Sequence, residues 1–159
     1  MTDELNKPAP HFSGLSDTQN TIKLDDFKGK TLVLYFYPKD DTPGCTLEAC
    51  GFRDTQETFK ALGAEIVGVS KDSVESHQAF KKKHAISFPL IADADSKICD
   101  AYGVIKEKNR DGKTYMGIER STFLIDQQGI IRQVWREVSV PGHIDELLDT
   151  IKKLPNTHG

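Results

Sequence analysis

Cys45 occupies a position where a reactive thiol would be expected, in the first turn of a predicted helix. Thr42 and Pro43 form an N-cap and first-position pair, which places Cys45 among backbone N–H groups that lack intrahelical partners. The helix dipole favours negative charge there and stabilises a thiolate, the form that attacks an electrophile. Many free cysteines are inert core residues, but Cys45 also follows a strand-to-helix loop, where functional side chains concentrate.

A second cysteine, Cys50, lies five positions further along the same predicted helix. On an intact α-helix the two Cα atoms would be about 8.6 Å apart, whereas a disulfide needs them within about 7 Å. A disulfide between Cys45 and Cys50 therefore requires the first turns of the helix to unwind. The spacing matches neither the closer cysteine pairs of zinc sites nor the C-x-x-C of dithiol oxidoreductases. From the residues alone, Cys50 could equally be a core residue.

Other residues that could support thiol chemistry have simpler interpretations when taken alone. Arg120 lies at the end of a predicted strand, where a surface arginine is commonly paired or solvated, and Glu48 is typical of a helix-surface carboxylate. Cys99 falls in a short predicted helix and is interpreted as a packed, inert thiol. The five histidines show no metal-ligand spacing, and none is placed to act as a base for Cys45. No metal site is predicted.

The elements that must position Cys45 alternate between strands and helices. Continuous apolar, β-prone runs at residues 30–37 and 65–70 predict strands buried on both faces. The helix that carries Cys45 should run from Pro43 to about Leu62, with Gly63 as its stop. The other predicted elements are a hairpin within 12–24, a helix over 73–83 with Asp72 as its candidate N-cap, an extended segment over 88–92, a short helix over 95–102, strands over 120–126 and 130–135, and a final helix over 144–154.

This order of elements predicts the fold class. Crossovers between the early strands imply parallel pairing, and the late hairpin implies antiparallel pairing. We therefore expect an α/β, thioredoxin-like fold: a mixed central β-sheet flanked by helices, with an N-terminal β-hairpin.

Composition indicates a single globular domain over residues 1–159, with its core between about residues 8 and 154. Apolar residues make up 37% of the chain and charged residues 28%, and the net charge of −3 gives no basic excess for nucleic acid. No run of about 18 apolar residues predicts a membrane span, and the N-terminus lacks the apolar stretch of a signal peptide. We expect a cytoplasmic protein, in which cysteines are seldom structural disulfides.

The string Pro38-x-x-x-Thr42-x-x-Cys45 resembles the active-site motif of the peroxiredoxins at each defining position. Glu48 and Cys50, three and five residues past Cys45, are similar to the bacterioferritin comigratory protein subfamily, also called peroxiredoxin Q. The resemblance extends from about residue 8 to residue 154 and includes the segments 112–115 and 120–126.

The resemblance implies a role for each of five residues. Cys45 would be the nucleophile that the peroxide oxidises to a sulfenic acid. Thr42 and Arg120 would contact the thiolate and the peroxide, and Pro38 would shield the pocket from water. Cys50 would be the resolving cysteine, which attacks the sulfenic acid to form an intramolecular disulfide.

The resemblance also implies what such an enzyme acts on. Its substrates would be hydrogen peroxide and organic hydroperoxides, and thioredoxin or a similar dithiol would reduce its disulfide. No haem, flavin or metal cofactor would take part. The protein would serve antioxidant defence, and the subfamily resemblance favours a monomer, which is consistent with an intramolecular disulfide that needs no partner subunit. A backup resolving role for Cys99 stays open.

Two other functions fit the same residues. A general thiol–disulfide oxidoreductase would act on protein disulfides without peroxide, although the missing C-x-x-C argues against it. A redox sensor or holdase would use a Cys45–Cys50 switch to control a partner and would turn peroxide over slowly.

Overall fold

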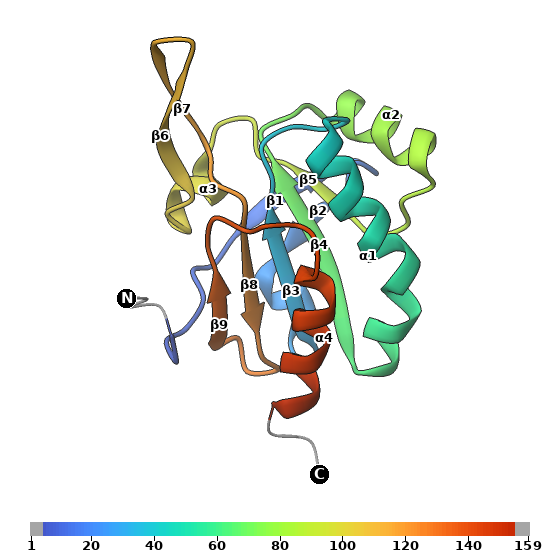
Figure 1. Ribbon diagram of the computed structural model, residues 1–159. Coiled ribbons are helices and arrows are strands. Elements are labelled where there is room, and N and C mark those ends of the chain that lie inside the picture. The colour runs from blue at the N-terminus through green and yellow to red at the C-terminus, as the bar shows by residue number, and fades with distance from the viewer. Residues whose placement is uncertain (1–4, 155–159) are drawn as a thin grey trace.

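A seven-stranded sheet with helices on both faces lies at the centre of the molecule in the computed structural model (Figure 1). The structure describes residues 5–154, so residues 1–4 and 155–159 of the predicted domain lie outside it. The elements are β1 (Ser13–Ser16), β2 (Thr21–Lys23), the 3₁₀ helix η1 (Leu24–Phe27), β3 (Thr31–Phe36), α1 (Pro43–Ala61), β4 (Ala64–Ser70), α2 (Val74–His84), β5 (Leu90–Ala92), α3 (Lys97–Ala101), β6 (Ile105–Arg110), β7 (Lys113–Ile118), β8 (Ser121–Ile125), β9 (Ile131–Trp135) and α4 (His143–Lys153).

The sheet is mixed, as the order of elements predicts. Its strand order is β2-β1-β5-β4-β3-β8-β9. The crossovers through α1 and α2 join the parallel strands β3, β4 and β5, whereas β8 pairs antiparallel with both β3 and β9. The predicted N-terminal hairpin is β1–β2, whose β1 strand adds antiparallel to β5. Of the helices that the structure describes, none is long and apolar enough to cross a membrane.

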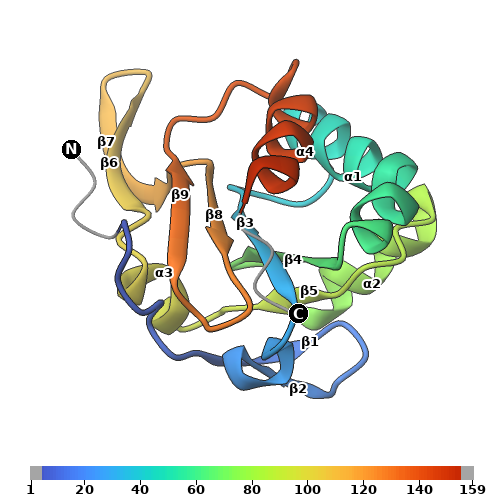
Figure 2. The same cartoon turned by 90° about the horizontal axis from the view of Figure 1, so that it is seen from below.

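Two hydrophobic cores lie on opposite faces of this sheet. Every residue of β3 is buried, and because side chains alternate along a strand, Val33 and Tyr35 belong to one core while Leu34 and Phe36 belong to the other. The first core packs under α1, α2 and α4, and the second under α3 and the N-terminal hairpin. Figure 2 shows these helices on their two sides of the sheet.

One helix cap differs from its prediction. Ser73, not Asp72, caps α2, and its side chain accepts a hydrogen bond from the Ser76 N–H. The Asp72 carboxylate instead accepts from the backbone N–H of Asp40 (2.7 Å) and from the Ser70 hydroxyl (2.8 Å). A long-range partner therefore occupies the carboxylate that local sequence assigned to the cap.

The hairpin β6–β7, which no sequence pattern predicted, forms a separate two-stranded sheet. Its residues are mostly exposed and polar, so they lack the apolar alternation that marks a strand. The signal that could have found it is Asp111-Gly112. Both residues have positive φ (54° and 78°), as a two-residue hairpin turn requires.

Candidate active site

Strand pairing brings the loop after β3 beside Arg120. In the parallel pair Phe36 lies opposite Val69, and in the antiparallel pair it lies opposite Ser121. The chain that leaves β3 therefore passes next to Arg120, which immediately precedes β8. The backbone carbonyl of Arg120 accepts a hydrogen bond from Val138 N–H (3.0 Å), which holds the backbone in place just before β8 begins.

Cys45 and Arg120 meet in this corner. Cys45 is in the first turn of α1 and is 2% exposed, and the Nη2 of Arg120 donates to its sulfur at 3.3 Å. A permanently charged donor thus joins the backbone N–H groups of the helix start, so the sulfur lies in an environment that favours negative charge. Gly44 makes room for the contact, because a Cβ there would lie 3.1 Å from that same Nη2.

Glu48 is buried in the site, so its interpretation as a helix-surface carboxylate is wrong. Its Oε1 accepts from Nη1 of Arg120 at 2.7 Å. The guanidinium therefore spans Glu48 and Cys45 with two of its nitrogens. The spacing of three residues could have revealed this, because side chains three apart share one face of a helix. Burial raises the pKa of Glu48 from 4.5 to about 7, against the opposing charge of Arg120.

We expect Glu48 to make the protein less stable as the pH rises. A carboxyl group with a raised pKa in the folded state binds its proton more tightly there, so its favourable contribution is lost between pH 4.5 and about 7. Glu48→Gln should therefore gain stability over wild type by on the order of 2 kcal/mol between about pH 5 and about pH 8. Urea unfolding at the two pH values measures this difference.

Glu57→Gln, at an exposed position of the same helix, is the matched control for that experiment. If Glu48→Gln and wild type changed in parallel with pH, the ionisation of Glu48 would not be coupled to folding in this way.

Thr42 and Pro38 lie on the loop between β3 and α1. Thr42 is the N-cap residue of α1 as predicted, but its hydroxyl donates to the backbone carbonyl of Lys39 (2.9 Å) instead of accepting from a helix N–H. This leaves the oxygen lone pairs of Thr42 available on the side away from that bond. Pro38 is exposed at the rim of the site.

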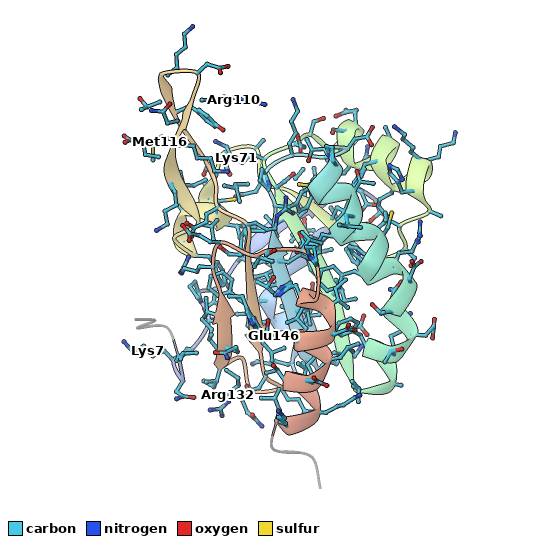
Figure 3. The ribbon with its side chains drawn as sticks, in the orientation of Figure 1. Lys7, Lys71, Arg110, Met116, Arg132 and Glu146 are labelled. Atoms are coloured by element: carbon cyan, nitrogen blue, oxygen red, sulfur yellow. The ribbon has the colours of Figure 1, made fainter. Side chains whose placement is uncertain are left out.

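A hollow of about 810 Å³ opens between this loop and the β6–β7 hairpin. Figure 3 labels Arg110 and Met116 on the hairpin and Lys71 near the main sheet. The residues that line the hollow are Pro38, Lys39, Thr42, Lys71, Lys108, Arg110, Asp111, Lys113, Thr114, Tyr115, Met116, Gly117 and Ile118. The wall is therefore basic with apolar side chains between the charges.

Lys108 links the hairpin to the site electrostatically. Burial, and then the positive charge of Arg120, lowers the pKa of the Lys108 ammonium, while Cys45 acts in the opposite direction. Its ammonium donates to the backbone carbonyl of Ile118 on the paired strand. The β6–β7 hairpin thus contributes a cation whose charge acts on Cys45 and Arg120.

The other two cysteines lie in different surroundings. All three thiols are free, and Cys50 is half-buried on the intact helix α1. The next residue, Gly51, lies against α4, because a Cβ there would come within 2.5 Å of Ile144. Cys99 is fully buried in the core on the opposite face of the sheet, where burial raises the pKa of its thiol. This placement agrees with a packed, inert Cys99.

Comparison with known proteins identifies the family of this chain. Residues 5–134 match the AhpC/TSA family. The chain is 52% identical over 154 residues to peroxiredoxin Bcp of Bacillus subtilis, covering 97% of this chain and 98% of the relative. It is 51% identical over 148 residues to a putative peroxiredoxin bcp of Coxiella burnetii, covering 93% and 98% respectively.

The fold is also shared with a solved structure. The bacterioferritin comigratory protein of Xanthomonas campestris, solved in work on its alkyl peroxide reduction activity, superposes with a TM-score of 0.85. It is 45% identical, and the match covers 89% of this chain and 90% of that chain. The chain therefore belongs to the AhpC/TSA family and is a thioredoxin-fold peroxiredoxin of the Bcp, or peroxiredoxin Q, group.

Proposed function

We propose that this peroxiredoxin reduces hydrogen peroxide and organic hydroperoxides with Cys45 as the nucleophile. The observation that carries the proposal is the pair formed by Cys45 and Arg120. The sulfur is 2% exposed at the start of α1, and a guanidinium nitrogen donates to it at 3.3 Å. A buried sulfur held against a fixed, charged donor is a preorganised nucleophile.

The first step is a displacement at oxygen. The sulfur lone pair of Cys45 forms an S–O bond as the O–O bond of the hydroperoxide breaks, and the leaving oxygen takes up a proton to become water or an alcohol. Sulfur is oxidised to a sulfenic acid. Charge moves from sulfur towards the leaving oxygen, so donors aimed at both ends lower the barrier. Arg120 supplies such donors, and the Thr42 hydroxyl offers lone pairs at the rim of the same site.

The second step joins Cys45 to Cys50. The Cys50 thiolate attacks the sulfenic sulfur, the S–S bond forms and hydroxide leaves. Both cysteines lie on the uninterrupted helix α1 (Pro43–Ala61), where ideal geometry separates their Cα atoms by about 8.6 Å. The first turns of α1 must therefore open before the bond can form.

A dithiol then restores the enzyme by exchange. Two electrons from the reductant cleave the Cys45–Cys50 disulfide, and the reductant leaves oxidised. We propose thioredoxin for this role and no haem, flavin or metal, because each step uses only sulfur and oxygen chemistry that the side chains supply.

The hollow beside the site supports organic hydroperoxides as substrates. Its volume of about 810 Å³ exceeds what hydrogen peroxide needs, and its lining includes Pro38 and Thr42 of the loop that leads into the first turn of α1, where Cys45 lies. Apolar side chains such as Met116 and Ile118 in its wall suit the carbon chain of an alkyl hydroperoxide.

We further propose that the protein acts as a cytoplasmic monomer in antioxidant defence. One chain carries the nucleophile, the arginine and the resolving thiol, so the cycle needs no second copy. A reducing compartment keeps both cysteines available as thiols and supplies the dithiol reductant.

Oxidation of NADPH in the presence of thioredoxin, thioredoxin reductase and the protein tests the function. We expect the rate to depend on added hydrogen peroxide or alkyl hydroperoxide, and to fall to background when thioredoxin is left out. A protein that reduces a protein disulfide in the absence of peroxide, but does not reduce peroxide, would be a general thiol–disulfide oxidoreductase, and the proposal would be rejected.

A further inference from the structure

A buried polar cluster lies directly behind the loop that precedes Cys45. Asp40 of this loop is 7% exposed, and His77 of α2 is fully buried. Nδ1 of His77 lies 2.7 Å from Oδ2 of Asp40, and the same oxygen accepts from the Ser76 hydroxyl at 2.8 Å. The other oxygen of Asp40 accepts from the Tyr37 hydroxyl at 2.6 Å. None of these contacts is part of the peroxide chemistry described above.

The geometry indicates that His77 carries hydrogens on both ring nitrogens. Nε2 lies 2.9 Å from the backbone carbonyl oxygen of Ile91 on β5, which can only accept, while Nδ1 faces the Asp40 carboxylate. Although burial acts against it, the hydrogen bond and charge of Asp40 raise the pKa of His77. With both nitrogens engaged, the ring has no lone pair for a metal, so we do not assign a metal site to Asp40, Asp72 and His77 despite their proximity.

Contacts lead from His77 to the active-site loop. His77 holds the Asp40 side chain, and Asp72 holds the Asp40 backbone N–H at 2.7 Å. The carbonyl of the preceding residue, Lys39, accepts the Thr42 hydroxyl (2.9 Å), and the Thr42 carbonyl accepts Thr46 N–H (2.8 Å) in the first turn of α1. Each link is a hydrogen bond of ordinary length.

We infer that His77, as an imidazolium between Asp40 and the Ile91 carbonyl, is a positioning residue for peroxide reduction at Cys45. It fixes the loop that ends at Thr42, the N-cap residue of the helix whose first turn carries Cys45. A neutral imidazole donates from only one nitrogen. Loss of the proton therefore breaks either the contact with Asp40 or the contact that anchors the ring to Ile91 of β5, and the loop is held less firmly in either case. This inference rests on the proposed function, because it concerns the rate of that same reaction.

The charged groups around His77 determine the direction of the effect. Asp40 and Tyr37 face it from the chain after β3, Asp72 faces it from the loop before α2, and β5 presents only the Ile91 carbonyl. These acidic neighbours favour the charged ring, so the complete contacts are present at low pH. They are lost as the pH rises through the pKa of His77 in the folded state, which lies above 6.5.

Competition with a haem peroxidase for hydrogen peroxide measures Cys45 oxidation alone, before resolution or recycling. We would compare wild type with His77→Gln from about pH 6 to about pH 9. The ratio of the two rate constants cancels titrations common to both proteins, including that of Glu48. At the acidic end we expect wild type to react about tenfold faster than His77→Gln, because a small displacement of a reacting group lowers the rate on this scale. At the alkaline end the ratio of the two rate constants should approach one.

His84→Gln is the matched control, because His84 is on the same helix and contacts the neighbouring Asp41, at the surface. The ratio of the wild-type rate constant to that of His84→Gln should stay close to one at every pH. Asp40→Asn removes the charge that holds the imidazolium and should reproduce the His77→Gln profile. This second variant keeps the test decisive if His77→Gln fails to give a folded protein by circular dichroism.

A folded His77→Gln or Asp40→Asn protein with the wild-type rate at every pH would overturn the inference. A reduction that is the same at every pH would also overturn it, since that would indicate a structural defect without titration. Complete absence of Cys45 oxidation in wild type would instead refute the proposed function, so the two failures can be told apart.

Discussion

Replacement of Cys45 by serine should remove peroxide-dependent NADPH oxidation. A serine hydroxyl is almost wholly protonated at neutral pH and cannot form the S–O bond, so the loss should be at least about a thousandfold, as for other removed nucleophiles. The surrounding contacts are kept, because serine is close to cysteine in size. The thioredoxin-coupled assay with hydrogen peroxide measures this directly.

Cys99→Ser is the matched control for that experiment. It makes the same chemical change in a fully buried cysteine on the opposite face of the sheet. The variant should keep most of the activity, provided that circular dichroism shows it folded. Undiminished activity in Cys45→Ser would refute the assignment of the nucleophile and, with it, the mechanism proposed above.

Replacement of Cys50 by serine should leave the first step intact and stop the second. The variant should consume about one equivalent of peroxide and then stall, because the sulfenic acid of Cys45 has no internal thiol to attack it. Rapid mixing with a small excess of peroxide gives the burst, and mass spectrometry with dimedone identifies the sulfenic acid. With more peroxide the same sulfur should advance to the sulfinic acid.

Continued turnover of Cys50→Ser with thioredoxin would show that another thiol resolves the sulfenic acid. The double variant Cys50→Ser, Cys99→Ser then separates the candidates. If turnover persists in it, an external thiol acts. If turnover stops, Cys99 acts, and α3 and the buried core around it must open during the cycle, since Cys99 is 0% exposed in the reduced protein.

The sequence predicts those features that depend on neighbouring residues. Thr42-Pro43 marks the start of α1, the apolar run of β3 marks a central strand, and Gln127–Gly129 marks the turn between β8 and β9. The motif around Cys45 and the distant Arg120 could be joined only through the family resemblance. Their 3.3 Å contact depends on the pairing of β3 with β8, which no local pattern determines.

The features that could not be predicted from the sequence depend on contacts across the fold. In the sequence Glu48 resembles any helix carboxylate, because its partner Arg120, which donates a hydrogen bond to it, lies 72 positions away. His77 is one polar residue among many on α2, and its importance lies in Asp40, 37 positions away. The β6–β7 hairpin is polar because it projects from the sheet, so it lacks the burial pattern on which strand prediction relies.

The sheet divides the interior into two cores, and this division limits how much of the structure must open when Cys45 and Cys50 form a disulfide. Cys45 and Ala49 at the start of α1 belong to the core on one face of the sheet, while Cys99 belongs to the core on the other. Opening the first turns of α1 for disulfide formation therefore disturbs one core and spares the second. In the proposed mechanism we therefore expect each catalytic cycle to involve a sub-global opening, with a free energy well below that of global unfolding. We expect the core around Cys99 to stay folded during this opening, so that the first turns of α1 can reform against an intact sheet after reduction.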